Sequence, residues 1–392
     1  MKDIYVKEEK LKGCTNHAKR GGVRPFVIAA LILAALAALL FLAPHILRWP
    51  VTVTLNGAQT QVAYGTSLRQ AAQRNLNRSQ LYGDLLAVDG SILREGGGGN
   101  PIFMVGGEEA SPDMPIRSSL SIAVHRGANN TEAIVEEEVD IEPELNRQGR
   151  GPLYHIVDPG QVGSILRSVG QQSEIELDTE ILVEPRAVEL HLSAFREEGP
   201  RLIALTFDDG PHPVHTPALL EVLAAEGVKA TFFVAGIEVV RFPEVAQRIV
   251  SEGHQIANHG YDHRDYSGLS YAEQREDFQR AQDIIEDATG IRPNWARPPY
   301  GQMNASTFSL FGEEDIKIAH WTIDPLDFRR PGTRVIRDRV VGEAQSGSII
   351  LLHDGGGDRE QTVQATREII RDLREEGFEF VTIEQLFERA NP

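Results

Sequence analysis

Cysteine is nearly absent from this sequence. The chain of 392 residues has only one, Cys14. No disulfide bond can form within the chain, so each domain has to be stable from its packed core alone. Positive charge is also scarce, since 39 lysines and arginines stand against 57 aspartates and glutamates, a formal net charge of -18. This balance makes nucleic acid and anionic lipid poor partners and suits neutral or cationic substrates.

Aspartate, glutamate, lysine and arginine are missing from residues 25–47, PFVIAALILAALAALLFLAPHIL. At ~1.5 Å per residue this run is long enough to cross a bilayer core of ~30 Å. We predict a basic cytoplasmic tail over 1–24, a single transmembrane anchor over 25–47 and an extracytoplasmic remainder, which places the protein in the cell membrane. A cleavable signal peptide is the alternative, which Pro44 directly after Ala43 disfavours.

Residues 51–200 show strand-like alternation but nothing that looks catalytic. The beginning, VTVTLNGAQTQVAYGTSLRQAAQ, predicts two strands joined by an Asn-Gly turn and followed by a helix that begins at Thr66 or Ser67. We interpret residues 51–125 as a small β-grasp-like domain and residues 126–200 as an acidic β-rich spacer or second small domain. The carboxylate run TEAIVEEEVDIEPEL is interpreted as a solvated face or linker, not as a metal site.

Strand-like and helix-like segments alternate from residue 201 onward. The segments RLIALTF, KATFFVAG, IKIAHWTID and SIILLHDG have the apolar composition of buried strands, and helical patterns such as SYAEQREDFQRAQDIIEDATG lie between them. This order predicts an α/β fold with parallel strands, either an open doubly wound sheet or a barrel. In both folds the functional site lies at the carboxyl ends of the strands.

Polar residues that suit catalysis follow five of the predicted strands. They are Asp208 and Asp209, His259 and His263, Arg297 and Tyr300, Asp324 and Asp327, and His353. Each has an ordinary structural explanation on its own, because Asp-Asp-Gly is a common turn and two histidines four residues apart are more often surface or core residues than ligands. Their shared position after strands predicts that they meet in one cleft.

The two histidines and one carboxylate of the Asp208-Asp209 pair suit a metal ion. Such a set leaves coordination positions for water and substrate, which is typical of catalytic rather than structural sites. Zinc, cobalt, nickel and iron all bind imidazole and carboxylate, so the ligand types alone leave the divalent metal open.

Proton transfer can be assigned to the remaining polar groups. The second aspartate of the pair can take a proton from water, and Arg297 would hold that base ionised. His353 would protonate the leaving group, and Asp324 is the expected partner that fixes its ring and raises its pKa. The structural alternatives are a surface ion pair for Arg297 and, for His353, a histidine that only caps a strand end.

The segments TFDDG, NHGYDH, RPPYG, DPLDF and LLHD, in this order, resemble the five motifs of the NodB-homology polysaccharide deacetylases, carbohydrate esterase family 4. The resemblance covers about residues 201–386, and we take 201–392 as the catalytic domain. It implies a distorted (β/α) barrel that removes N- or O-acetyl groups from polysaccharides with a divalent metal, often zinc.

The resemblance also implies roles for individual residues. By motif position the metal ligands are Asp209, His259 and His263. The other roles fall to Asp208 as base, Arg297 as the residue that orients it, the backbone N–H of Tyr300 at the oxyanion, His353 as general acid, Asp324 as its tuning partner, and Leu351 in the acetyl pocket.

Two positions depart from the family pattern. Phe328 stands where the fourth motif commonly has tryptophan, and Gly260 stands where the second motif usually has serine or threonine. Neither change removes a metal ligand or a proton-transfer group. We therefore expect activity to survive and the shape of the pocket, which Phe328 and Tyr300 help to line, to affect substrate preference.

The predicted function is metal-dependent deacetylation of an N-acetylglucosamine-type cell-envelope polysaccharide, with peptidoglycan favoured because the anchor tethers the enzyme beside the wall. The expected metal is zinc, with cobalt, nickel and iron as alternatives. Alternatives are an O-acetyl esterase or an exopolysaccharide deacetylase of the same family, and a wall-binding module without turnover. The expected contacts are an acetylated polysaccharide and, through one N-terminal helix, the membrane, with no nucleic acid.

Overall fold

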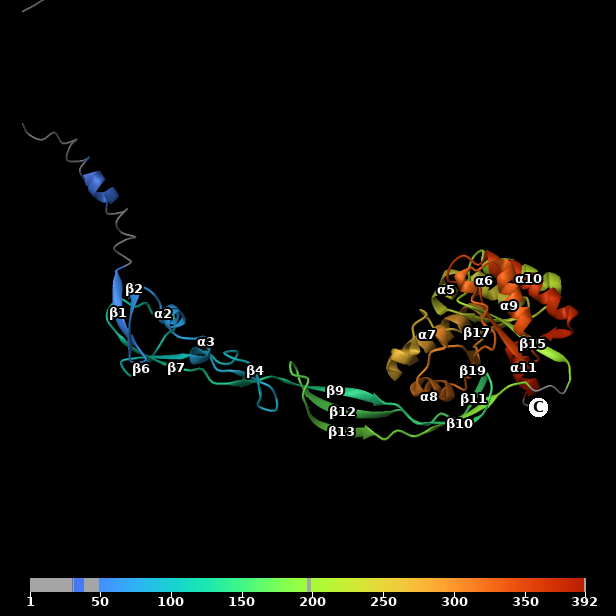
Figure 1. Ribbon diagram of the computed structural model, residues 1–392, viewed down its shortest axis with the longest axis horizontal. Coiled ribbons are helices and arrows are strands. Elements are labelled where there is room, and N and C mark those ends of the chain that lie inside the picture. Colours follow the sequence, from blue (N-terminus) through green and yellow to red (C-terminus); the bar gives the residue numbers. More distant parts are fainter. Residues whose placement is uncertain (1–29, 31, 39–48, 196–198, 391–392) are drawn as a thin grey trace, which may run out of the picture. The chain divides into compact units, whose positions relative to one another are not determined.

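The computed structural model describes residues 30, 32–38, 49–195 and 199–390. The predicted transmembrane segment, 25–47, lies largely outside these residues. In the described part of the chain no helix is both long and apolar enough to span a bilayer. Contacts divide the chain into two units, Met1–Ile134 with Gly170–Ile175, and Val135–Val169 with Glu176–Pro392 (Figure 1).

The first unit has a five-stranded sheet with a helix against it. The sheet has the order β2-β1-β7-β5-β6, in which β1 and β2 form an antiparallel hairpin and β7 runs parallel to β1. These strands are β1 (Pro50–Leu55), β2 (Ala58–Ala63), β5 (Ile102–Val105), β6 (Glu108–Ala110) and β7 (Ser121–His125). The helix α2 (Leu68–Asn75) begins after Ser67, whose hydroxyl accepts from the backbone N–H of Gln70. Val53, Leu68 and Phe103 belong to the core between them.

Shorter elements complete this unit and continue into the next. Helix α3 (Arg78–Leu81) is followed by a small sheet of β3 (Leu85–Leu86), β4 (Ile92–Arg94) and β8 (Asn130–Thr131). A further three-stranded sheet has the order β13-β12-β9 and consists of β9 (Ile134–Ile141), β12 (Gly163–Gly170) and β13 (Glu176–Val183).

Three carboxylates of the acidic run have specific partners. Glu132 is buried and accepts hydrogen bonds from the backbone N–H groups of residues 88, 172 and 173. Asp140 and Glu142 accept from the backbone N–H groups of Tyr271 and Ser306, at the first turns of two helices of the second unit. Carboxylates are favourable there because the first N–H groups of a helix have no partner within it. The run is therefore more than a solvated face.

The second unit is built around a closed, irregular barrel of parallel strands. The strands are β15 (Arg201–Asp208), β16 (Thr231–Val234), β17 (Gln255–Asn258), β18 (Trp295–Ala296), β19 (Lys317–Ala319) and β20 (Ser348–His353). They pair in chain order, and β20 returns to pair with β15. Beyond β19, a parallel bridge joins Ile323 to Ile350 and closes the ring. The distorted barrel expected from the motifs is therefore present, and the open sheet is excluded.

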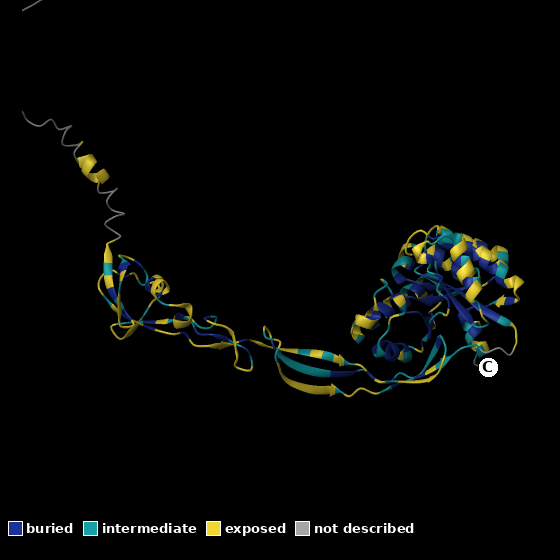
Figure 2. Ribbon diagram, in the orientation of Figure 1, coloured by how far each residue is buried: buried dark blue, intermediate teal, exposed yellow. Residues whose placement is uncertain are grey.

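Helices cover the outside of this barrel. They are α4 (His215–Glu226), α5 (Gly236–Arg241), α6 (Pro243–Ser251), α7 (Tyr271–Thr289), α8 (Ala305–Glu313), α9 (Thr333–Glu343), α10 (Glu360–Glu375) and α11 (Ile383–Ala390), with β21 (Phe378–Phe380) beside the start of β15. Figure 2 shows the strands buried and the outer helix faces exposed. Phe207, Phe232 and Ile350 lie in the main core, so burial on both faces explains the continuous apolar runs of the strands.

Part of the segment expected to be a spacer belongs to this unit. The strands β10 (Leu145–Gly149), β11 (Leu153–Asp158) and β14 (Val188–Ser193) extend the barrel sheet at β19, with β11 antiparallel to β19. Leu153 and Val188 are fully buried, and the latter packs in one cluster with Phe308 and Ile318. The expected domain boundary at residue 200 therefore differs from the structure, because these alternating strands cover an edge that the barrel would otherwise expose.

Candidate active site

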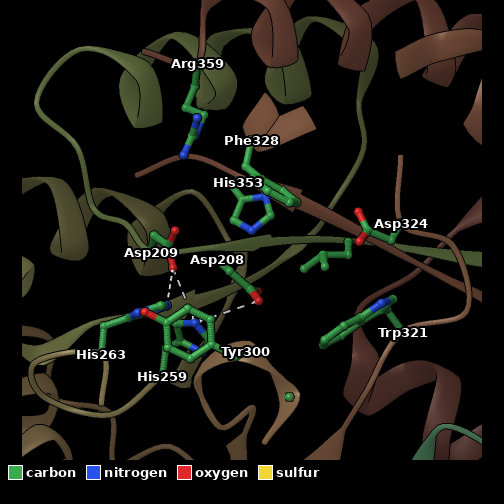
Figure 3. Close-up of a pocket in the computed structure, with 12 residues that line it drawn as sticks. Asp208, Asp209, His259, His263, Tyr300, Trp321, Asp324, Phe328, His353 and Arg359 are labelled. Atoms are coloured by element: carbon green, nitrogen blue, oxygen red, sulfur yellow. Dashed lines mark ion pairs between the residues drawn. The ribbon is translucent and has the colours of Figure 1, made fainter. Parts of the chain in front are cut away.

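The predicted site residues lie around one pocket at the carboxyl ends of the barrel strands (Figure 3). The pocket has a volume of about 370 Å³. Its lining includes Asp208, Asp209, His259, His263, Tyr300, Trp321, Asp324, Phe328, Leu351, His353 and Arg359. Arg297 lies directly behind Asp208, and Asp327 lies behind His353. The barrel thus brings together residues that are up to 151 positions apart in the sequence, Asp208 and Arg359.

Asp209, His259 and His263 form the only cluster among the described residues that could hold a metal ion. Oδ1 of Asp209 lies 3.4 Å from Nε2 of His259 and 3.1 Å from Nε2 of His263. This oxygen is buried and has no hydrogen-bond partner. Burial raises the pKa of Asp209, but the two imidazoles outweigh it and hold the pKa below its usual range. An orphaned carboxylate oxygen between two imidazole nitrogens fits a divalent cation.

The two histidines are held by different means. Nδ1 of His259 lies 2.5 Å from the carbonyl oxygen of Arg297, which directs Nε2 toward Asp209. His263 has a left-handed backbone, φ 63°, and its ring packs edge-on against Tyr300. Asp277 accepts from the backbone N–H of Tyr261 at 2.9 Å and so stabilises the turn between the two ligands. Partners of this kind fix the orientation of ligand rings.

Gly260 within this turn has a structural reason. Its φ is +76°, and a Cβ at this position would lie 2.9 Å from the carboxylate of Asp277 and 3.3 Å from the hydroxyl of Tyr266. The Tyr266 hydroxyl donates to the same carboxylate at 2.7 Å. Glycine therefore suits position 260, because the backbone is left-handed and a side chain would crowd the Asp277 carboxylate.

Asp208 and Arg297 form a buried ion pair. Oδ1 of Asp208 accepts from Nη1 of Arg297 at 2.7 Å, and both side chains are almost fully buried. The guanidinium also donates to the carbonyl oxygens of Ala319 and His320 and to the hydroxyl of Thr206. With its other donors bound to the backbone and to Thr206, Arg297 can hold the Asp208 carboxylate in one position.

His353 has a different partner from the expected one. Nδ1 of His353 lies 2.7 Å from Oδ1 of Asp327, and the backbone N–H of His353 donates to Oδ2 at 3.0 Å. Burial lowers the pKa of His353, but the carboxylate of Asp327, with smaller contributions from Asp209 and Asp208, outweighs burial and raises the pKa to about 9. Asp324 instead accepts from the backbone N–H of Leu326 at 2.8 Å. The prediction that Asp324 tunes His353 is therefore wrong.

The reason lies in the loop after the strand. Leu326 has a left-handed backbone, φ 57°, and the short helix η3 (Asp327–Arg329) follows it. This turn directs Asp327 inward, where Thr362 also donates to its carboxylate at 2.8 Å. Asp324 remains on the wall of the pocket, where its side chain caps its own loop.

Aromatic and apolar side chains complete the walls. Leu351 is 5% exposed, and Phe328 packs edge-on against His353 with ring centres 5.6 Å apart. Tyr300 is 63% exposed at the mouth and has a left-handed backbone, φ 58°. Asp209 has the same unusual conformation, φ 72°. Left-handed non-glycine residues at a pocket are typical of backbone strain held for function.

Several residues of the site were not singled out for a role by the sequence. The motif pattern gives Asp327 no role of its own, and no motif points to Asp277, Trp321 or Arg359. Asp354 is also buried, accepts from the hydroxyl of Thr216, and packs so closely on Gly210 that a Cβ there would lie 2.1 Å from its Oδ2. Asp354 directly follows His353 in the segment LLHDGGG, and this position in a motif was the feature of the sequence that could have indicated a role for it.

Comparison with known proteins shows the family of the chain. Residues 196–318 match the polysaccharide deacetylase family. A peptidoglycan-N-acetylglucosamine deacetylase of Bacillus cereus is 38% identical over 194 residues, which are 47% of this chain and 88% of that protein. A chitooligosaccharide deacetylase of Bradyrhizobium sp. is 38% identical over 200 residues, 48% of this chain and 91% of that protein. The solved Bc1960 peptidoglycan N-acetylglucosamine deacetylase is 34% identical, with 50% and 91% of the chains covered and a TM-score of 0.48.

The chain belongs to the polysaccharide deacetylase family, carbohydrate esterase family 4, and the resemblance of its five motifs is confirmed. It is therefore a hydrolase of the class that removes acetyl groups from polysaccharides.

Proposed function

We propose that this protein is a metal-dependent deacetylase that hydrolyses the N-acetyl groups of an N-acetylglucosamine-type cell-envelope polysaccharide, and that this polysaccharide is peptidoglycan. The observation that carries the proposal is the single pocket in which the Asp209-His259-His263 cluster lies beside Asp208 and His353. The names of relatives such as the Bacillus cereus peptidoglycan-N-acetylglucosamine deacetylase support the substrate.

Asp209, His259 and His263 would hold the metal, which we propose is zinc, with cobalt, nickel and iron as alternatives. When bound, the metal would polarise the acetyl carbonyl and make water a better nucleophile at neutral pH. The protein supplies the remaining groups at fixed positions around the reacting acetamide.

Asp208 and His353 are proposed to move the protons. Asp208 takes one proton from the attacking water, whose oxygen bonds to the acetyl carbon, while Arg297 stabilises the carboxylate in its ionised form. Nε2 of His353 points into the pocket because Nδ1 is bound to Asp327, and it donates a proton to the amide nitrogen as the C–N bond breaks. The products are acetate and a free amine on the sugar.

The pocket walls are proposed to position the acetyl group. Leu351, Trp321 and Phe328 line the pocket and suit a methyl group that has to leave water. The backbone N–H of Tyr300, at the mouth, is the proposed donor to the oxyanion that develops on the carbonyl oxygen.

Acetate release tests this proposal. Purified protein would be incubated with N-acetylglucosamine oligomers, peptidoglycan and acetylated xylan, with chelator and after re-addition of single metals. Metal-restored release from the first two substrates is the expected result. Release from xylan alone would identify an O-acetyl esterase. Tight binding to wall material without any release, unchanged in Asp208→Asn, would indicate a binding module instead.

We also propose that residues 25–47 anchor the protein in the cell membrane, with the N-terminus cytoplasmic and the catalytic unit outside. The basic tail and the uncharged apolar run support this arrangement. The sheet and helix of residues 50–125 are proposed to form a β-grasp-like domain. Fusions of a reporter enzyme after residues 24 and 60 test the topology, since only the second should be active outside the membrane.

A further inference from the structure

The wall of the pocket contains an arginine that the chemistry above does not use. Arg359 directly precedes α10, is 5% exposed and lines the pocket. Its Nε donates to the carbonyl oxygen of Gly355 at 2.8 Å, and Nη2 donates to that of Gly356 at 3.0 Å. Nη1 has only a long contact, 3.4 Å, with the carbonyl oxygen of Asp358. The guanidinium is thus hydrogen-bonded to its own turn.

Arg359 has no opposite charge within ion-pair distance in the described part of the chain. The carboxylate of Asp358, its neighbour in sequence, pairs instead with Nη2 of Arg330 at 2.5 Å. The carboxylate of Asp209 lies nearby, since its Oδ2 and Nη2 of Arg359 are 2.8 Å and 3.3 Å from the position that a Cβ of Gly356 would take, but Asp209 belongs to the metal cluster. A buried cation that forms no ion pair is unfavourable unless an anion can reach it. Because Arg359 lines the pocket, a bound molecule can approach it from that side.

A second arginine without an acidic partner lies beside a residue that lines the pocket. Arg329 is exposed, and its Cζ lies 5.5 Å from the ring centre of Phe328. Phe328 lines the pocket and contacts the ring of His353. No ion pair of Arg329 occurs among residues 199–390. On a chain with a net charge of -18, an unpaired arginine in the pocket wall and a second one beside Phe328 give this side of the pocket a local positive charge.

The charges around the pocket are arranged asymmetrically. Asp208 is neutralised by Arg297, and Asp209 would be neutralised by the metal. Asp324 is a carboxylate that forms no ion pair among the described residues, and Figure 3 shows it approaching the pocket from a different side from Arg359. An anionic group would therefore be attracted to the side of Arg359 and Phe328 and repelled from the side of Asp324.

We propose that Arg359 and Arg329 form a carboxylate-binding subsite that makes the enzyme prefer acetylated glycans carrying a carboxylate on or next to the reacting sugar. This inference rests on the proposed deacetylase function and deepens it, because it assigns recognition of the carboxylates that a peptidoglycan strand carries to particular residues of this chain. Arginine suits the role because its planar donors match a carboxylate. The acetate product is also a carboxylate and could bind the same arginines. The test therefore has to distinguish a carboxylate of the glycan from the acetate product.

Three substrates of equal length would be compared. They are a neutral N-acetylglucosamine oligomer, a peptide-free peptidoglycan strand with lactyl carboxylates on alternate sugars, and the same strand with these carboxylates converted to carboxamides. The measured quantity is the ratio of kcat/KM for the acidic strand to that for the amidated strand. We expect a ratio of about tenfold for the native protein, from one charge-assisted hydrogen-bonded pair.

The variants are Arg329→Gln, Arg359→Gln and Arg359→Lys. Arg329→Gln should reduce the ratio several-fold, Arg359→Gln should bring it near one, and Arg359→Lys should retain part of it. The matched control is Arg292→Gln, which also removes one positive charge but whose side chain pairs with Asp283 and Glu286 on the surface. That control should leave the ratio unchanged. If Arg359→Gln fails to fold, the other two variants decide.

A native ratio near one, or a ratio unchanged in both Arg329→Gln and Arg359→Lys, would overturn the proposal. Competitive inhibition by acetate that is lost in the Arg359 variants, with no change in the glycan ratio, would also overturn it and assign the subsite to the product. If none of the substrates is deacetylated, the proposed function fails, and calorimetric binding of the acidic and amidated strands still tests the subsite.

Discussion

Oδ1 of Asp327 lies 2.7 Å from Nδ1 of His353, and the other oxygen of the same carboxylate accepts from the backbone N–H of His353. This double contact fixes both the ring and the strand end from which it projects. It leaves Nε2 as the nitrogen that faces the pocket. The histidine can therefore act as a proton donor only in the geometry that Asp327 imposes.

Replacing Asp327 by Asn should lower kcat by about 10- to 100-fold, the usual cost of losing a partner that orients a functional histidine. The pKa of His353, raised to about 9 in the native protein, should fall toward its ordinary value. The alkaline limb of the kcat profile should then move to lower pH. Asp324→Asn is the matched control and should change kcat much less, since Asp324 does not touch His353. Equal losses in the two variants would contradict this assignment.

Replacing Asp209 by Asn should weaken metal binding and reduce acetate release to near background. The neutral amide would still fit the space, but it removes the negative charge that lies between His259 and His263. Metal content per chain, measured by elemental analysis, should fall together with activity. A variant with full metal content and no activity would indicate that Asp209 acts in proton transfer instead.

A fragment of residues 201–392 should be less stable than a fragment of residues 135–392. The shorter fragment lacks β11, which pairs with β19, and β14, whose Val188 and Leu190 pack with Phe308 and Ile318. Their removal exposes apolar surface and an unpaired strand edge. Urea unfolding followed by circular dichroism measures the difference. Equal midpoints would show that residues 145–193 contribute no stability to the barrel.

His254 should make the native protein less stable as the pH falls from about 6.5 to 4. Burial and Lys229 lower the pKa of this histidine to about 4. Above the ordinary histidine pKa neither state binds the proton, and between the two pKa values the unfolded chain binds it while the folded chain does not. Protonation therefore favours unfolding in that window.

The variant His254→Asn tests this, because asparagine can accept from the backbone N–H of Ala230 as Nδ1 of His254 does. The variant should lose less stability than the native protein when the urea midpoint is measured at pH 7.5 and again at pH 5. An identical loss in both proteins would exclude His254 as a source of the pH dependence.

Part of the catalytic set could be predicted because it depends on residue type and on position after a strand. Carboxylates and imidazoles are the side chains that bind divalent metals, and parallel strands deliver whatever follows them to one end of a barrel. Asp209, His259 and His263 do lie within reach of one ion, as expected. The pairing of Asp208 with Arg297 was also expected, because a guanidinium among these motifs can bind the carboxylate that acts as base.

Contacts that depend on the path of a loop could not be predicted in this way. Asp324 and Asp327 have the same chemistry and lie three residues apart, so the sequence does not distinguish them. The left-handed backbone at Leu326 turns one carboxylate toward His353 and leaves the other on the pocket wall. The same limit applies to Arg359, whose lack of an acidic partner becomes visible only when Asp358 is seen to bind Arg330.

The amino-acid sequence by itself determined the family, the kinds of ligand and the proton-transfer groups, because these follow from side-chain chemistry and from the order of the motifs. The tertiary structure decided which carboxylate serves His353, where the catalytic unit begins, and which charges at the pocket remain unpaired. These outcomes depend on contacts between segments far apart in the chain, such as β11 with β19 and Thr362 with Asp327. Contacts of that kind depend on packing in three dimensions, and the local pattern of apolar and polar residues in the sequence does not predict them.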